Sequence, residues 1–199
     1  MLLFLIMQVI RLKKGVWKFT DWPGLSSNVY LLELDVPTLI DLGNSVYHKQ
    51  LVQCLKKVGY KPENIKRIIF THLHFDHTGN YKAFKNADFY AGAEEIEDLE
   101  QGKFTKFLQR FGIRLPKLEL NIKPVKKGFK DLVVIKTPGH TRGSISLWLK
   151  SKKLLFTGDT LFHNNIIGRT DLPTSVPEEM EKSLKKLKRY KYAILCPGH

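Results

Sequence analysis

The chain has 199 residues, of which 43% are hydrophobic and 26% are charged, and its formal net charge is +14. These values are ordinary for a water-soluble globular protein with one sizeable domain, or with two half-domains around one core, and they speak against a disordered chain. Two cysteines, Cys54 and Cys196, are too few for a disulfide framework and suit a reducing cytoplasm.

The first half of the chain predicts short strands and two helices. The strands are rich in β-forming residues and are separated by turn sequences such as Trp22-Pro-Gly24. The longer helix has one apolar face and is stopped by Gly59 just beyond its end. The predicted elements are the strands Gln8–Arg11, Val16–Phe19, Asn28–Leu34, Thr38–Asp41, Lys66–Phe70 and Asp88–Ala91, and the helices Val46–Val58 and Glu94–Glu100.

The second half follows the same logic after an irregular connection. Residues 101–130 are interrupted by glycines and prolines, and we expect them to connect two similar halves, about 8–100 and 130–199, of a single domain that spans 1–199. Ser175 and Glu178 predict a capping box at the start of a helix. The predicted elements are the strands Leu132–Lys136, Ser144–Lys150, Lys153–Thr157 and Tyr192–Cys196, and the helix Ser175–Tyr190.

The apolar run at residues 1–7 is much shorter than the roughly 20 residues that span a bilayer. It also lacks a basic leader and a small-residue cleavage site. We therefore expect no membrane anchor and a cytoplasmic protein.

Histidine and aspartate are concentrated in one segment, Thr71-His-Leu-His-Phe-Asp-His77, directly after a predicted strand. His140, Asp159 and His199 also follow predicted strands. Imidazoles and carboxylates at such spacing are typical of a shared divalent metal ion. Because loops at a common edge of two sheets can meet, the sequence predicts a metal centre there.

The chain resembles the metallo-β-lactamase-fold hydrolase superfamily over nearly its whole length. A further motif, Gly168-Arg-Thr-Asp-Leu-Pro173, resembles the glyoxalase II-like branch, which includes thioester hydrolases and persulfide dioxygenases. The resemblance implies an α/β fold, a four-layer αββα sandwich of two facing mixed β-sheets with helices outside. The motifs that carry it are Thr71-His-Leu-His-Phe-Asp-His-Thr-Gly79, Thr137-Pro-Gly-His-Thr-Arg-Gly-Ser144, Thr157-Gly-Asp-Thr-Leu-Phe162 and Cys196-Pro-Gly-His199.

The resemblance also implies two divalent ions, each held by three side chains, with one carboxylate shared between them. We expect zinc from the nitrogen and oxygen ligands, with iron or manganese as alternatives. The implied ligands are His72, His74 and His140 for the first ion, Asp76, His77 and His199 for the second, and Asp159 as the bridge.

Two ions about 4 Å apart would turn a shared water into hydroxide near neutral pH. We expect the hydroxide to attack an activated carbonyl, and the resemblance implies a small thioester, as in hydroxyacylglutathione hydrolases. Asp76 is the expected catalytic residue, because its carboxylate can orient the hydroxide or move its proton. Arg142 is a candidate for binding an anionic substrate group, and His163 is a candidate for facing the substrate cleft.

Glyoxalase II enzymes continue into a helical domain that supplies much of the glutathione pocket. Nothing follows His199 in the sequence, so we do not expect glutathione specificity or S-lactoylglutathione as the substrate.

Two other activities remain open. A persulfide dioxygenase would use a single iron held by His72, His140 and Asp159. A nuclease acting on RNA would use the same motifs, and the charge of +14 would suit a phosphate backbone. The lysines are scattered along the chain, however, and we interpret them first as a soluble surface. The expected partner is therefore a small molecule.

Overall fold

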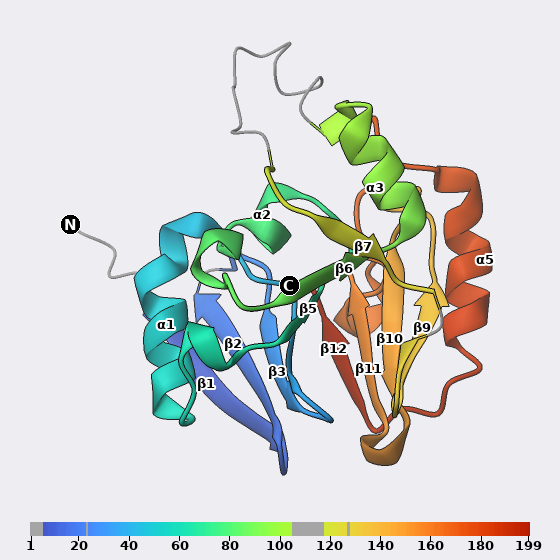
Figure 1. The fold of residues 1–199 in the computed structure, drawn as a ribbon. Helices are drawn as coiled ribbons and strands as arrows, with labels where there is room; N and C mark the ends of the chain where they lie inside the picture. Colours follow the sequence, from blue (N-terminus) through green and yellow to red (C-terminus); the bar gives the residue numbers. More distant parts are fainter. Residues whose placement is uncertain (1–5, 23, 105–117, 127) are drawn as a thin grey trace.

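The computed structural model describes residues 6–22, 24–104, 118–126 and 128–199. Two mixed sheets face each other, with α1 (His48–Lys57) outside one sheet and α5 (Pro177–Leu187) outside the other (Figure 1). The four-layer sandwich predicted from the sequence is confirmed.

The first sheet has seven strands in sequence order. The strands from β1 to β4 are antiparallel, whereas those from β4 to β7 are parallel. They are β1 (Ile6–Lys13), β2 (Val16–Trp22), β3 (Val29–Glu33), β4 (Pro37–Ile40), β5 (Arg67–Ile69), β6 (Asp88–Ala91) and β7 (Ile122–Pro124).

The second sheet has five strands in the order β12-β11-β10-β9-β8. Only the pair β11 and β12 is parallel within it. The strands are β8 (Gly128–Phe129), β9 (Leu132–Lys136), β10 (Ile145–Leu149), β11 (Leu154–Gly158) and β12 (Ile194–Pro197).

Shorter helices lie between the strands. α2 (Phe75–Thr78) and α3 (Ala93–Glu100) lie in the upper part of the view, above the C-terminus, which is marked near its middle (Figure 1). The 3-10 turns are η1 (Ser45–Tyr47), η2 (Pro62–Asn64), η3 (Tyr81–Ala83), η4 (Lys150–Lys152) and η5 (His163–Asn165).

Side chains of the central strands point alternately to the two faces of the first sheet and pack in the layers on both sides of it. In β3, Leu31 packs in the cluster that includes Leu51 and Leu55 of α1. Tyr30 and Leu32 on either side of it pack against the second sheet. Because successive side chains of a strand point to opposite faces, one short apolar strand can serve two cores. A third cluster joins the second sheet to α5.

The prediction of an irregular segment over residues 101–130 is wrong in two places. Residues 122–124 form β7, which pairs with β6, and residues 128–129 form β8, which pairs with β9. Residues 105–117 and 127 of this segment lie outside the described residues. Both strands are too short to show a periodic sequence pattern, and they are defined by their pairing partners.

The predicted capping box of the last helix is also wrong. α5 begins at Pro177, after a Val176 N-cap that has no side-chain hydrogen bond. The Ser175 hydroxyl donates instead to the backbone carbonyl of His140, at 2.7 Å. A residue type that favours helix caps is thus used to hold a loop of the second sheet.

Among the described residues, no helix is both long enough and apolar enough to cross a membrane. Residues 1–5 of the apolar opening run lie outside the described part of the chain. Both cysteines are buried and free.

Candidate metal centre

Strand ends bring the predicted ligand residues to one edge of the two sheets. β5 ends at Ile69, shortly before His72. β9, β11 and β12 run in the same direction, because β9 and β11 are both antiparallel to β10 and β12 is parallel to β11. The loops after these three strands carry the remaining ligands, so residues that lie far apart in the chain meet at the carboxyl ends of the strands.

His72, His74 and His140 form a compact group. Nδ1 of His74 lies 3.0 Å from Nε2 of His72 and 3.0 Å from Nε2 of His140. The three rings are nearly perpendicular to one another, with centroids 4.6 to 4.7 Å apart. Their nitrogens therefore converge on one point, as the ligands of a single ion would.

Burial keeps these three imidazoles neutral. It lowers the pKa of His72 well below the usual value, and the neighbouring imidazoles add to the effect. It also lowers the pKa of His74 to about 3 and lowers that of His140. A neutral imidazole has a free lone pair, which is the form that binds a metal ion.

Asp76, His77 and His199 form a second group that could hold an ion. Nε2 of His199 lies 3.2 Å from Oδ2 of Asp76, and Nε2 of His77 lies 3.9 Å from the same oxygen. Burial opposes ionisation of Asp76, but the hydrogen bond from His199 and the nearby imidazoles lower the pKa of the carboxyl overall. Asp76 is therefore ionised at neutral pH.

Asp159 lies between the two groups. Its Oδ1 is 3.3 Å from Nε2 of His77, and its Oδ2 is 3.6 Å from Nε2 of His140 and 3.7 Å from Nε2 of His199. The His72 and His77 rings are also adjacent, with centroids 4.0 Å apart. One carboxylate thus contacts ligand candidates of both groups, which is the position that a bridging ligand requires.

Two unsatisfied atoms test whether metal ions fit this site. Nε2 of His77 and Oδ1 of Asp159 are buried, and apart from their mutual contact at 3.3 Å neither has a hydrogen-bond partner within the described residues. Leaving a buried polar atom unpaired costs about 1–3 kcal/mol. A divalent ion would satisfy both atoms, and the nitrogen and oxygen donors around them suit zinc, iron or manganese. The residues present therefore fit a metal pair.

Backbone and side-chain groups outside the ligand set orient the rings. Nδ1 of His140 donates to the carbonyl of Arg169 at 2.7 Å. Nδ1 of His77 lies 2.9 Å from the carboxylate of Asp41. Such partners on the second ring nitrogen fix the tautomer and turn the other nitrogen towards the ion.

The charge on His77 depends on two neighbouring carboxylates, those of Asp41 and Asp159. Burial alone would lower its pKa, but the carboxylates of Asp41 and Asp159 raise the pKa well above its usual value. In the absence of metal, the His77 imidazole is therefore the cation that balances two buried carboxylates.

The two predicted substrate-binding residues lie in different surroundings. The Arg142 guanidinium is held by Asp98 at 2.7 Å and by Glu97 at 2.8 Å, both on α3. His163 is exposed at the start of η5, next to Phe162, whose ring lies 6.2 Å from that of His199. Substrate binding by Arg142 and by His163 stays a prediction.

Arg169 and Asp171 pair with each other on the surface, at 2.8 and 2.9 Å. This ion pair shapes the loop in which the backbone carbonyl of Arg169 accepts a hydrogen bond from Nδ1 of His140.

The sequence interpretation missed two buried acids, Asp41 and Glu95, that contact the ligand loops. Asp41 was predicted only as the end of a strand, and Glu95 only as a helical residue. An acid on an amphipathic helix gives no sign of its burial, because the sequence alone does not show which face of the helix is buried.

Comparisons with known proteins agree with this geometry. A profile of the metallo-beta-lactamase superfamily matches residues 22–199. The chain is 35% identical to the probable metallo-hydrolase MJ0888 of Methanocaldococcus jannaschii over 187 residues, covering 88% of each protein. It is 30% identical to an N-acyl homoserine lactonase of a Bacillus species, covering 73% of this chain and 58% of the lactonase. Its fold is similar to that of TTHA1623 in a di-iron-bound form, with a TM-score of 0.71, 27% identity and 88% of each chain covered.

Proposed function

The chain belongs to the metallo-beta-lactamase superfamily, and we propose that it is a metal-dependent hydrolase that attacks the carbonyl carbon of a small, activated ester, with a thioester as the first candidate. The observation that carries the proposal is the pair of three-residue ligand groups on either side of Asp159. The preference for a thioester rests on the resemblance of Gly168-Arg-Thr-Asp-Leu-Pro173 to the glyoxalase II-like branch.

Two divalent ions held by these groups would supply a water activated for attack near neutral pH and would polarise the carbonyl. The neutral imidazoles of the first group add no negative charge, so they leave the ions strongly electrophilic. Asp159 lowers the net charge of the site and lies where it can hold the ions together.

Asp76 is the proposed catalytic residue. Its lowered pKa makes it a weak base but a good hydrogen-bond acceptor, so its carboxylate is better suited to orient the attacking water than to store a proton. A carboxylate that is ionised at neutral pH also has no proton to give a leaving group. A thiolate, whose conjugate thiol has a pKa of about 8.5, can leave without one, which favours a thioester.

A lactone is the second candidate substrate. It is favoured by the similarity to N-acyl homoserine lactonases, which covers 73% of this chain. A lactone has the same carbonyl chemistry, but its leaving group is an alkoxide that stays attached to the product. Assays on both substrate classes with one preparation would rank the two.

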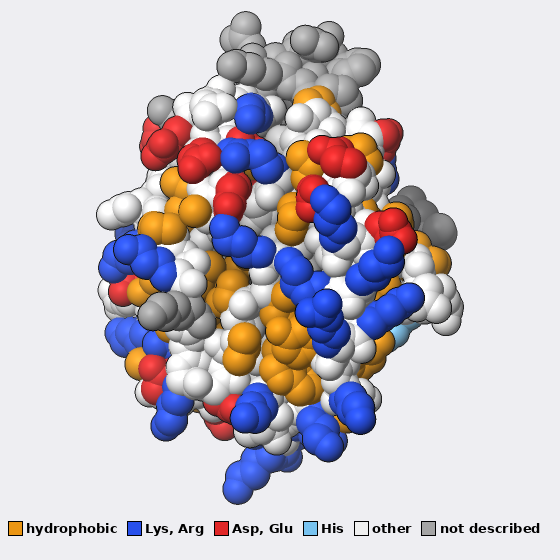
Figure 2. All heavy atoms as spheres, turned by 90° about the vertical axis from the view of Figure 1, so that its right-hand side faces the viewer, with side chains coloured by type: hydrophobic (Ala, Val, Ile, Leu, Met, Phe, Trp, Pro, Cys, Tyr) orange, Lys and Arg blue, Asp and Glu red, His pale blue; other side chains and the backbone are white. Residues whose placement is uncertain are grey.

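Basic side chains on the face that carries α5 are in part already paired with acids. Lysine and arginine side chains cover the middle and lower part of this face, and acidic side chains lie mainly above them (Figure 2). On α5, Lys182 pairs with Glu179 and Lys185 with Glu181.

The two buried, free cysteines support a cytoplasmic location, since neither thiol is paired.

The deciding experiment is elemental analysis of protein purified without added metal, together with thioester and lactone cleavage assays on the same sample. About two zinc, iron or manganese ions per chain with turnover of either ester would support the hydrolase. About one iron per chain, with oxygen uptake on a persulfide and no ester cleavage, would replace it with the dioxygenase. RNA cleavage with a steep salt dependence would replace it with a nuclease.

A further inference from the structure

A buried glutamate on α3 contacts both loops that carry the three-histidine group. Glu95 is 0% exposed. Its Oε2 accepts from the backbone N–H of Leu73 at 2.8 Å. Its Oε1 accepts from Oγ1 of Thr141 at 2.5 Å and from the N–H of Gly143 at 3.1 Å. Each carboxylate oxygen thus serves one loop.

The hydrogen-bond donors to Glu95 lie next to the three candidate ligands in the chain. Leu73 lies between His72 and His74, and Thr141 follows His140 directly. The two loops come from different sheets, after β5 and β9. Because Glu95 contacts both, its carboxylate helps to set the distance between the first two histidines of the group and the third.

Close packing leaves α3 little freedom to move relative to the second loop. A methyl group on Gly92 would collide with the carbonyl oxygen of Gly143, and one on Gly143 would collide with the backbone N of Glu95. One turn along the helix, Asp98 is 1% exposed and binds Arg142 at 2.7 Å. Two acids on the same face therefore hold the helix against residues 141–143.

A glutamate is a costly choice for a buried position. Burial raises the pKa of Glu95 to about 7, while its hydrogen-bond donors act to lower it. An apolar side chain of similar volume would avoid the cost of burying a carboxylate, so folding stability alone does not account for an acid here. Three convergent donors on two ligand loops point to a role in the site.

We propose that Glu95 is a positioning residue that sets the geometry, and therefore the metal affinity, of the His72–His74–His140 group, while the second group depends on other contacts. The inference rests on the proposed function only in requiring that this group binds an ion. It predicts a selective effect, because the described contacts of Glu95 do not include Asp76, His77 or His199.

Glu95→Gln is the informative substitution. Glutamine keeps the shape of the side chain but replaces one carboxylate oxygen with an amide that donates. Either the Leu73 N–H or the pair of donors on residues 141–143 would then face another donor. One loop would lose its hydrogen bonding to residue 95, and the other loop would keep it.

The test measures binding of cobalt(II) to metal-free, full-length protein by its visible absorption, with each group isolated in turn. Asp76→Ala disables the second group, and His74→Ala disables the first. In the Asp76→Ala background, Glu95→Gln is expected to weaken cobalt binding about 10–100-fold and to change the ligand-field bands. In the His74→Ala background it is expected to leave cobalt affinity unchanged.

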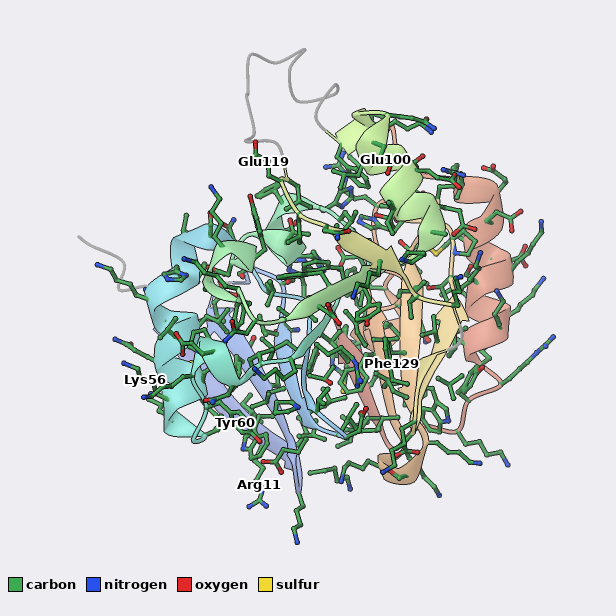
Figure 3. All side chains as sticks on the ribbon, in the orientation of Figure 1. Arg11, Lys56, Tyr60, Glu100, Glu119 and Phe129 are labelled. Carbon is green, nitrogen blue, oxygen red and sulfur yellow. The ribbon has the colours of Figure 1, made fainter. Side chains whose placement is uncertain are left out.

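Glu100→Gln is the matched control, because Glu100 is an exposed glutamate on the same helix (Figure 3). It is expected to leave both affinities unchanged. The assay needs no substrate, so a failure of the proposed hydrolysis would appear as absent turnover in a protein that still binds two ions.

A second pair of variants covers the case in which Glu95→Gln does not fold. Thr141→Val removes one of the three donors, whereas Thr141→Ser keeps the hydroxyl. The first is expected to weaken cobalt binding several-fold in the Asp76→Ala background, and the second to restore it. Folded Glu95→Gln or Thr141→Val protein with unchanged cobalt affinity would overturn the proposal, as would equal losses at both groups.

Discussion

Oδ2 of Asp41 lies 2.9 Å from Nδ1 of His77, and the same carboxylate accepts from the N–H and the hydroxyl of Thr71, each at 2.8 Å. Asp41 is 2% exposed and follows β4 in a left-handed backbone conformation, with φ of 55°. One buried carboxylate therefore fixes both the start of the ligand loop and the ring that contacts Asp159.

We expect Asp41→Asn to weaken metal binding at the Asp76–His77–His199 group about 10–100-fold. Asparagine tolerates the left-handed conformation, so the backbone should be retained. Its amide group would face the donors of Thr71 and His77, which should lower the free energy of unfolding by about 1–3 kcal/mol. Metal titration and denaturant unfolding of the metal-free protein measure the two effects.

Asp35→Asn serves as the control, because Asp35 is a more exposed carboxylate that pairs with Arg67 just before β4. It should leave metal affinity unchanged. Wild-type metal affinity in Asp41→Asn would show that the His77 ring is held by other contacts.

The candidate ligands stand out in the sequence because their residue types and their places after strands are local features. The segment Thr71–Gly79, His140 and Asp159 lie in the loops that follow β5, β9 and β11. The acids that orient the ligand loops could not be predicted in this way. Asp41 and Glu95 contact the ligand loops only through the tertiary fold, and nothing in their local sequence marks them as polar groups to be buried.

The strands and helices likewise divide into those that local sequence predicts and those that depend on tertiary contacts. The central strands were predicted from short segments rich in β-forming residues, as in β6 and β9. β7 and β8 have three and two residues, too few for any period to appear, and they exist because β6 and β9 offer free edges. Ser175 was misassigned because a serine that caps a helix and one that holds a loop look alike in sequence.

Asp159→Ala should abolish binding of the second ion and hydrolysis together. The carboxylate contacts His77, His140 and His199, so its removal takes a ligand candidate from both groups. We expect activity below about a hundredth of the wild-type value, with fewer ions per chain by elemental analysis. Asp88→Ala, which removes an exposed acid paired with Lys123, should keep both. An Asp159→Ala protein that retains two ions and full turnover would remove the shared-carboxylate scheme.

The metal-free protein should lose stability in acid, because three of its histidines are buried in the neutral form. The pKa of His74 falls from 6.5 in the unfolded chain to about 3 in the folded protein, and the pKa values of His72 and His140 are also lowered. Below pH 6.5 the unfolded chain therefore binds more protons than the folded protein, so stability falls as the pH drops towards the folded values.

Denaturant midpoints measured from about pH 7 to about pH 4 would show this fall of stability with decreasing pH. The fall should be smaller in His74→Asn protein. His77 should act in the opposite direction. Its pKa is raised in the folded protein, so its contribution is present below pH 6.5 and is lost as the pH rises through the folded value. An acid slope that is the same in wild-type and His74→Asn protein would contradict the neutral form of His74.

Gly198→Ala should weaken metal binding more than it weakens the fold. A methyl group at this position would collide with Oδ1 of Asp159 and would lie 3.0 Å from Cε1 of His77. Gly198 is not among the glycines with positive φ, so alanine needs no left-handed backbone there. Its methyl group would also lie 3.0 Å from the backbone carbonyl carbon of Gly158, which calls for a small local shift. We expect at least about a 10-fold loss of metal affinity, as for other changes beside a ligand, with a small change in melting temperature.

Gly59→Ala provides the reverse case. Gly59 ends α1 with φ of 86° and has open space around it. Alanine there should cost about 1–2 kcal/mol of folding free energy through the left-handed backbone and should leave metal affinity unchanged. Measured together by cobalt titration and thermal unfolding, the two glycine variants separate the shape of the site from the stability of the chain. If Gly198→Ala binds cobalt as the wild type does, the Asp159 carboxylate can shift without loss of the site, and its role as a fixed bridge would have to be abandoned.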